Sequence, residues 1–164
     1  MAVLACNNSN PQQTSSTSIP ATEDTLAQMP GSGAKSSVST DDQLFETAFG
    51  SFKTAVEQNS EELLKGMMHF PLQTSDGELS DADFHSKYKE VFNADVRNLI
   101  PKAGEGHTKE VAASNQETYY TQLRKTTDKD AKLFEVHTAQ TGNHFVFVFG
   151  KVQGNYKVVG YYSK

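Results

Sequence analysis

Residues 144–152 read HFVFVFGKV, and this stretch decides what kind of fold the chain can form. Its three phenylalanines alternate with His144, Val146 and Val148, which is the two-residue period of a β-strand. Because both sets of side chains are largely apolar, neither face of this strand is suited to water. We expect helices to cover one face of the sheet, and the other face to line a pocket, close on itself or meet a partner.

The same two-residue period continues on both sides of this stretch. It predicts further strands from Glu117 to Leu123, at residues 133–137 and at residues 156–162. Gln153-Gly154-Asn155 separates the last two strands, and its glycine favours a tight hairpin. The sequence therefore predicts an antiparallel meander in the C-terminal part of the chain.

Upstream of the meander, apolar residues recur at three- and four-residue intervals, which is typical of helices. Three helices are expected, beginning near Thr40, Ser60 and Ser80, residues that can cap a helix N-terminus. The segment Phe70–Thr74 reads as a short edge strand, because Pro71 cannot donate a hydrogen bond to a central ladder. Residues 102–116 are expected to be a loop with short extended pieces.

The chain divides near residue 40. Residues 7–40 are built from Asn, Gln, Ser, Thr, Pro and Gly with a few aliphatics, and no aromatic residue precedes Phe45. Such a segment cannot bury enough apolar surface to offset the entropy of ordering it. We therefore expect residues 1–40 to be a disordered tether. Residues 41–164 should form one α+β domain, with three N-terminal helices on a curved antiparallel sheet of about four to six strands.

Composition excludes several classes of function. A net charge of −5 over 164 residues is ordinary for solubility and predicts no nucleic-acid partner. A single cysteine excludes an intramolecular disulfide framework or a multi-thiolate zinc site, and no apolar run is long enough to cross a bilayer. The sequence contains no histidine pair at helical metal-binding spacing and no complete phosphate-binding loop, so we predict neither a metal nor a cofactor.

The start of the chain, Val3-Leu4-Ala5-Cys6, resembles the lipobox of bacterial lipoproteins. The resemblance implies lipidation of Cys6 and a location at the bacterial cell envelope, where membrane contact is made through the lipid anchor alone. Only five residues precede Cys6, whereas a signal peptide needs an apolar stretch of roughly 7 to 15 residues. The lipoprotein interpretation therefore requires a longer precursor, and the alternative is a cytoplasmic protein with a polar N-terminal segment.

The order of the predicted elements is similar to that of the nuclear transport factor 2-like superfamily, which includes small bacterial secreted proteins of unassigned function. The resemblance rests on packing motifs: Phe45, Phe49 and Phe52; Met67-Met68-His69-Phe70-Pro71-Leu72; Ser80-Asp81-Ala82-Asp83-Phe84; and Tyr88, Val91 and Phe92. It implies a cone-like fold in which the sheet curls around a pocket. Enzymes of this superfamily hold an Asp or His base and Tyr hydroxyls inside that cone. Packing motifs support a fold more than an activity.

We expect a ligand pocket lined from the helices and from the sheet, by Phe70, Tyr88, Tyr120, His137 and Phe147. No residue is assigned a catalytic role, because none matches a known catalytic motif. The leading hypothesis is a non-enzymatic, envelope-anchored domain that binds a small apolar ligand or a protein through its curved aromatic sheet. One alternative is a small lyase or isomerase with a His base and Tyr donors. Another is an assembly protein that uses the uncovered sheet face, for instance as a homodimer.

Overall fold

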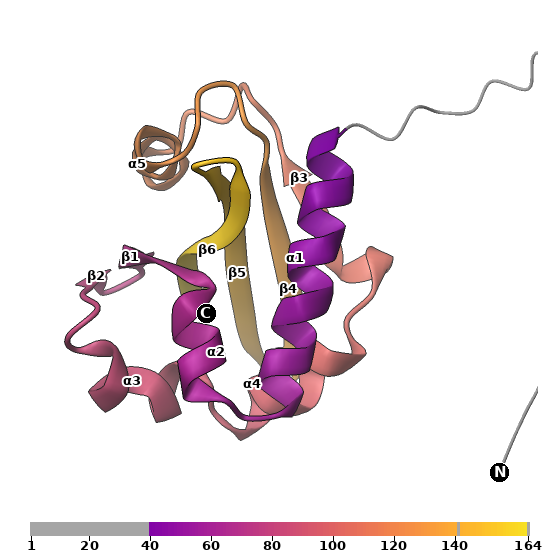
Figure 1. The fold of residues 1–164 in the computed structure, drawn as a ribbon, viewed down its shortest axis with the longest axis vertical. Helices are drawn as coiled ribbons and strands as arrows, with labels where there is room; N and C mark the ends of the chain where they lie inside the picture. The colour runs from indigo at the N-terminus through magenta and orange to yellow at the C-terminus, as the bar shows by residue number, and fades with distance from the viewer. Residues whose placement is uncertain (1–39, 141, 164) are drawn as a thin grey trace, which may run out of the picture. The chain divides into compact units, whose positions relative to one another are not determined.

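The sheet predicted from residues 144–152 is the centre of the domain. A computed structural model describes residues 40–140 and 142–163. These residues form a curved, unclosed sheet of six strands with helices packed against it (Figure 1). The predictions for the tether and for Cys6 fall outside the described residues.

Helices and strands alternate along the chain more often than the sequence predicted. The α-helices of the described residues are α1 (Thr40–Glu57), α2 (Glu61–Gly66), α3 (Phe84–Val91), α4 (Ala94–Leu99) and α5 (Thr118–Thr126). The strands are β1 (Met68–Thr74), β2 (Gly77–Leu79), β3 (Thr108–Val111), β4 (Leu133–Gln140), β5 (Asn143–Val152) and β6 (Asn155–Ser163). Two short 3₁₀ turns, Ile100–Lys102 and Glu105–His107, lie between α4 and β3. The predicted α+β class is therefore confirmed, with five α-helices where three were expected.

The strands lie in the order β2-β1-β6-β5-β4-β3. Neighbouring strands run antiparallel except β1 and β6, which are parallel. The β5–β6 hairpin turns at Gln153 and Gly154 as predicted, and both residues have positive φ, 52° and 83°. The two carboxylate oxygens of Asp128 accept hydrogen bonds from the backbone N–H groups of Gln153 and Gly154, each at 2.8 Å. This side chain fixes the turn from outside the hairpin.

The prediction that residues 70–74 form an edge strand is wrong. β1 lies between β2 and β6, and β2 is the edge. Pro71 is tolerated there because the register of β1 against β6 shifts between Met68 and Gln73. Where the register shifts, the regular hydrogen bonds between the two strands are interrupted, so the N–H that proline lacks is not needed.

The strand predicted from Glu117 to Leu123 is also wrong, because this segment is helix α5. Its two buried side chains, Tyr120 and Leu123, are three residues apart, a spacing that a helix places on one face. Arg124 supports the helix by donating to the backbone carbonyls of Asn115 at 2.6 Å and Ala112 at 2.8 Å. Packing against the sheet, rather than local pattern, decides this segment's conformation.

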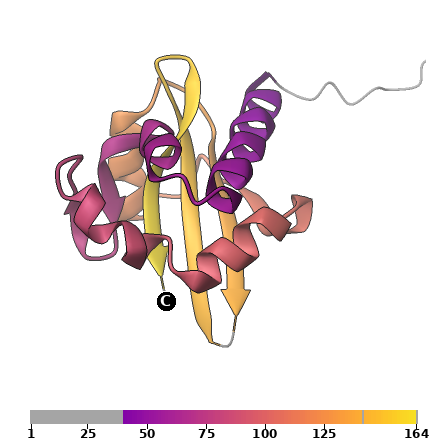
Figure 2. The same cartoon turned by 60° about the horizontal axis from the view of Figure 1, so that its bottom comes forward.

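We name the two sides of the sheet by the helices that cover them. On the α1 face, the predicted stripe of α1 packs onto the phenylalanines of β4 and β5, and the ring centroids of Phe45 and Phe134 are 4.2 Å apart. Figure 2 shows α1 and α4 lying in front of the long strands. On the α5 face, Leu123 joins a second, smaller core with Val146, Val148 and Val159. The sheet is apolar on both sides, as predicted, but the expectation that helices cover one face only is wrong, because α5 packs on the second face.

Two glycines of the sheet allow α5 and the loop after it to approach closely. A Cβ at Gly160 would overlap the Tyr119 hydroxyl, and a Cβ at Gly150 would overlap the side chains of Thr127 and Leu133. The absence of a side chain at these two positions therefore sets how near the helix lies to the strands.

Candidate functional site

Two cavities flank the C-terminal end of β6, one on each face of the sheet. Tyr161 lines the cavity on the α1 face, and its neighbour Tyr162 lines the cavity on the α5 face. Successive side chains of a strand point to opposite faces, so this pair reaches both cavities. Ser75 and Ser163 line both of them, which places the cavities back to back at the same end of the sheet.

The α1-face cavity has a volume of about 340 Å³ and lies between the β1–β2 turn, α3 and the end of β6. Val91, Phe145 and Tyr161 provide apolar surface, and each is at least nine-tenths buried. Lys87 and Glu90 stand among the lining residues as an ion pair of 2.7 Å. Burial raises the pKa of the Tyr161 hydroxyl, so it stays protonated at physiological pH. The cavity thus combines an aromatic floor with charged groups.

The α5 face carries a compact set of polar side chains, which we call the tyrosine–glutamate cluster. Its members are Tyr119, Tyr120, Glu135, His137 and Tyr162. Glu135 is only 5% exposed, and its Oε1 accepts hydrogen bonds from the hydroxyls of Tyr120 and, at 3.0 Å, Tyr162. Nε2 of His137 lies 2.9 Å from Oε2 of the same carboxylate. Both carboxylate oxygens therefore have partners.

These contacts explain how a carboxyl group can be buried beneath a helix. Removing an ionised carboxylate from water is costly unless hydrogen bonds replace the lost hydration. Burial, together with the hydrogen bond to Glu135, raises the pKa of Tyr120 far above its ordinary value. Burial and the charge of Glu135 also raise the pKa of Tyr162. The two phenols are therefore neutral donors at physiological pH.

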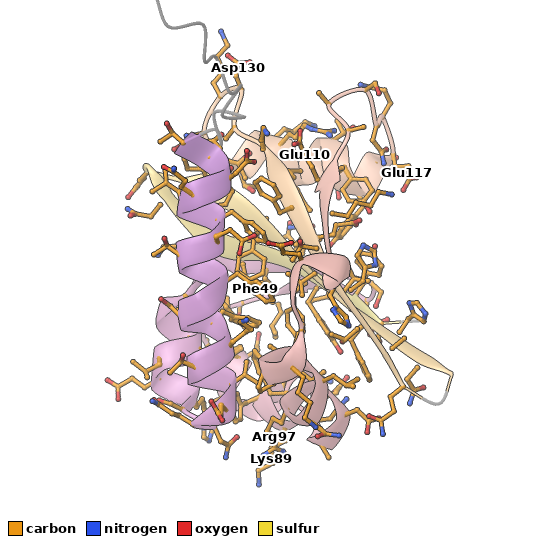
Figure 3. The ribbon with its side chains drawn as sticks, turned by 90° about the vertical axis from the view of Figure 1, so that its right-hand side faces the viewer. Phe49, Lys89, Arg97, Glu110, Glu117 and Asp130 are labelled. Atoms are coloured by element: carbon orange, nitrogen blue, oxygen red, sulfur yellow. The ribbon has the colours of Figure 1, made fainter. Side chains whose placement is uncertain are left out.

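Tyr119 completes the aromatic part of the cluster. Its ring is nearly perpendicular to those of Tyr120 and Tyr162, at 78° and 87°, with centroids 5.4 Å away in both pairs. Its hydroxyl donates to the backbone carbonyl of Gln73 at 3.4 Å, which joins α5 to β1. The adjoining cavity, about 380 Å³, is lined by Ser75, Glu117, Tyr119, Tyr120, Tyr162 and Ser163. Figure 3 shows Glu117 on the side of the sheet opposite α1.

The structure divides the five predicted pocket residues between the two faces. Phe147 is fully buried in the α1-face core, Tyr88 donates to Asn59 Oδ1 at 3.0 Å, and Phe70 packs edge-on against Phe84. None of these three lines either cavity beside β6. The other two, Tyr120 and His137, meet at Glu135 on the α5 face. Of the histidine and two tyrosines expected to line a pocket, His137 and Tyr120 are therefore brought together on the α5 face, whereas Tyr88 belongs to the α1-face core.

Sequence reasoning missed Glu135, Glu117 and Tyr162 as site residues. A signal for Glu135 was present, because it stands between Phe134 and Val136 in a strand and shares a face with His137. His137 pairs with Val146, and Val146 pairs with Tyr162, so His137 and Tyr162 lie in one row across the sheet. Glu135 lies two residues before His137 on the same face of β4, in the neighbouring row. That convergence depends on strand register across β4, β5 and β6, which no single stretch of sequence specifies.

Across residues 40–140 and 142–163, no group of three or more His, Cys, Asp or Glu side chains is arranged to hold a metal ion. None of the helices in the same residues has the length and apolar character needed to span a bilayer.

The fold and its cavities define a small α+β domain with a curved, open sheet. No protein-family model matches the chain, and no curated protein matches it. Among solved structures, the chain is similar to an NTF2-like protein of unknown function from Shewanella baltica OS155. The two are 11% identical, the match covers 74% of this chain and 90% of that one, and the TM-score is 0.38. A likeness of that size carries no argument about function.

Proposed function

We propose that this domain binds a small molecule in the α1-face cavity beside β6. The observation that carries the proposal is a cavity of about 340 Å³ with Phe145 and Tyr161 at its base and Lys87 and Glu90 among its lining residues. Ligand sites are typically concave, about 300–1,000 Å³, mostly apolar, and provided with a few polar groups that fix orientation. The cavity has a volume in this range, and its apolar residues Val91, Phe145 and Tyr161 lie among polar and charged side chains that could orient a ligand.

The packing of the α1 face indicates where such a ligand would lie. Phe147 at the centre of the sheet is already covered by Phe52 and Phe92, with ring centroids 5.2 and 5.7 Å away. A ligand is therefore excluded from the middle of the aromatic face and is directed to its edge. There, an apolar group would contact Tyr161 while a polar group would reach Lys87 or Glu90.

The experiment uses benzyl alcohol, benzoate and benzylamine as probes, with binding followed by NMR shifts of the Val91 and Leu79 methyl groups. We expect at least one probe to shift both residues at millimolar concentration. Leu79→Trp should fill the cavity and abolish the shift of the Val91 methyl groups, which remain as the reporter in this variant. The control, Leu63→Trp, places the same side chain on α2 at a position that is 51% exposed, and it should leave binding intact. Unshifted methyl groups, or binding that survives Leu79→Trp, would overturn the proposal.

We also propose that the domain works at the bacterial cell envelope, attached through lipid on Cys6. Support comes from the lipobox-like residues Val3–Cys6 and from the polar composition of the segment that follows them. The test compares the intact mass and membrane partitioning of a full-length precursor in a bacterial host with those of Cys6→Ala. An acyl mass increase that disappears in the variant supports the anchor. An unmodified mass in both proteins refutes it.

Acid–base catalysis by a small lyase or isomerase is a second candidate function. The observation that favours it is the contact of His137 with Glu135, which also accepts from the hydroxyls of Tyr120 and Tyr162, two residues that line a cavity. Such a site should catalyse deuterium exchange from D₂O into an acidic carbon of a simple ketone probe such as ethyl acetoacetate. The exchange rate should fall to the uncatalysed value in His137→Gln. Equal rates in the two proteins would exclude this role for that probe class.

A further inference from the structure

The cavity on the α5 face has a lining suited to one class of ligand, and this inference is independent of the α1-face cavity. Three of its six lining residues are tyrosines, and Tyr119 stands nearly perpendicular to both Tyr120 and Tyr162. The face of an aromatic ring is electron-rich, and its edge is electron-poor. Such faces attract cations, most strongly where water is displaced.

The charges around the cavity also favour a cation. Glu117 lines it, and among the described residues of its wall none is basic. Behind the tyrosines lies Glu135, a buried carboxylate that holds the hydroxyls of Tyr120 and Tyr162. Donation to a carboxylate polarises a phenol and increases the negative potential of its ring. Because burial keeps these phenols protonated, the tyrosines attract a cation through their rings and do not carry formal charges.

One feature of the same cavity opposes a cation. α5 begins at Thr118, and the N-terminal end of a helix carries a partial positive charge. Glu117 immediately precedes this end and supplies a full negative charge beside it. A full carboxylate charge exceeds the half charge of a helix terminus. The balance therefore favours a cation, and an anion becomes the alternative that the experiment must be able to detect.

We propose that the α5-face cavity binds a small organic cation, such as an alkylated ammonium group, against Tyr119, Tyr120 and Tyr162, with Glu117 as its counter-charge. Alkylated ammonium ions suit such a site because their charge is spread over methyl groups that pack against rings. The volume of about 380 Å³ is adequate for a small ligand.

The test compares choline with 3,3-dimethylbutan-1-ol, which has the same shape without the charge. Binding is followed by NMR of ring-labelled tyrosine, because the chain contains six tyrosines and no tryptophan. We expect choline to shift Tyr119, Tyr120 and Tyr162 and to bind about five- to tenfold more tightly than the neutral isostere. Equal affinity for the two compounds would overturn the proposal. Methanesulfonate shifting these tyrosines in place of choline would overturn it as well.

Two variants locate the site, and each has a matched control. Glu117→Gln should weaken choline binding severalfold, whereas Glu105→Gln, in the 3₁₀ turn before β3, should not. Tyr119→Leu should abolish binding, while Tyr119→Phe, which keeps the ring and loses only the bond to Gln73, should retain most of it. If Tyr119→Leu does not fold, Tyr119→Phe and Glu117→Gln still decide the question. Unchanged choline affinity in Glu117→Gln, or its loss in Tyr119→Phe, would contradict the assignment.

Discussion

The hydroxyls of Tyr120 and Tyr162, residues 42 positions apart in the chain, lie 3.3 Å from each other and donate to the same oxygen of Glu135. One residue comes from α5 and the other from β6. Glu135 of β4 therefore links α5, β4 and β6 at one point. The shared acceptor attaches α5 to the sheet through Tyr120.

Replacing Glu135 should destabilise the domain strongly. Glu135→Ala leaves two phenols and His137 without their acceptor beneath α5, and we expect the free energy of unfolding to fall by about 3 kcal/mol. Glu135→Gln keeps one carbonyl oxygen and should cost less. Urea denaturation measures both values. Glu110→Gln, which removes an exposed partner of Lys132, should cost under about 1 kcal/mol and serves as the control. A loss in Glu135→Ala no larger than in the control would show that the cluster contributes little.

Stability should decline in acid, in part through Asp41. The hydrogen bond from Lys151, at 2.6 Å, holds the pKa of the Asp41 carboxyl below its ordinary value of 3.8. Because the folded pKa is lower than the unfolded one, the unfolded chain takes up the proton first as pH falls. The contribution is therefore present above the unfolded pKa and is lost as pH falls through the folded pKa.

Unfolding free energies measured by urea at a series of pH values between neutral and strongly acidic test this effect. Asp41→Asn should lose about 1 kcal/mol near neutral pH and show a flatter decline toward acid than the unmodified protein. Asp130→Asn, a substitution in the turn before β4, should reproduce the unmodified profile. Parallel profiles for Asp41→Asn and the unmodified protein would rule out this carboxyl as a source of acid sensitivity.

Thr138→Val should stabilise the domain. Thr138 is only 3% exposed, and its Oγ1 has no hydrogen-bond partner among the described residues. Valine has nearly the same shape and β-branching but no buried hydroxyl, so we expect a gain of about 1 kcal/mol in the free energy of unfolding. Thr138→Ser keeps the hydroxyl and removes the methyl group, and it should destabilise. A melting temperature that falls in Thr138→Val would mean that the hydroxyl has a partner in solution.

Asp128→Ala should loosen the β5–β6 turn. It removes both acceptors of the backbone N–H groups of Gln153 and Gly154, and we expect a loss of about 2 kcal/mol. Asp128→Asn keeps one of the two oxygens and should fall between the parent and the alanine variant. Amide hydrogen exchange at residues 153 and 154 gives a local readout, since protection there should drop most. Unchanged exchange at these two amides would show that the turn holds its shape without Asp128.

The features that could be predicted from the sequence are those decided by neighbouring residues. The buried stripe of α1 and the alternation in β5 are each encoded within one segment, and the Gly154 turn is encoded within a few residues. Ser60 caps α2 as expected, since its side chain accepts from the backbone N–H of Leu63. Local chemistry was sufficient in these cases.

The features that could not be predicted depend on partners distant in the chain. A period of two over five or six residues at Tyr119–Leu123 also fits one turn and a half of helix, and only the apolar second face of the sheet selects α5. The interior place of β1 follows from its parallel pairing with β6. The site escaped prediction because Glu135 obtains its partners from two other elements.

The ionic contacts at the start of α1 have a mechanical consequence. Asp41 is bonded to Lys151 of β5, and Asp42 to Lys132 just before β4. Any pull transmitted along the backbone into Thr40 reaches the domain at this point. Lys151 lies in β5 and Lys132 directly precedes β4, and both of these strands have hydrogen-bonded neighbours on each side. A load applied at Thr40 therefore reaches β5 and the residue before β4 through these ion pairs, in addition to the packing of α1 on the sheet.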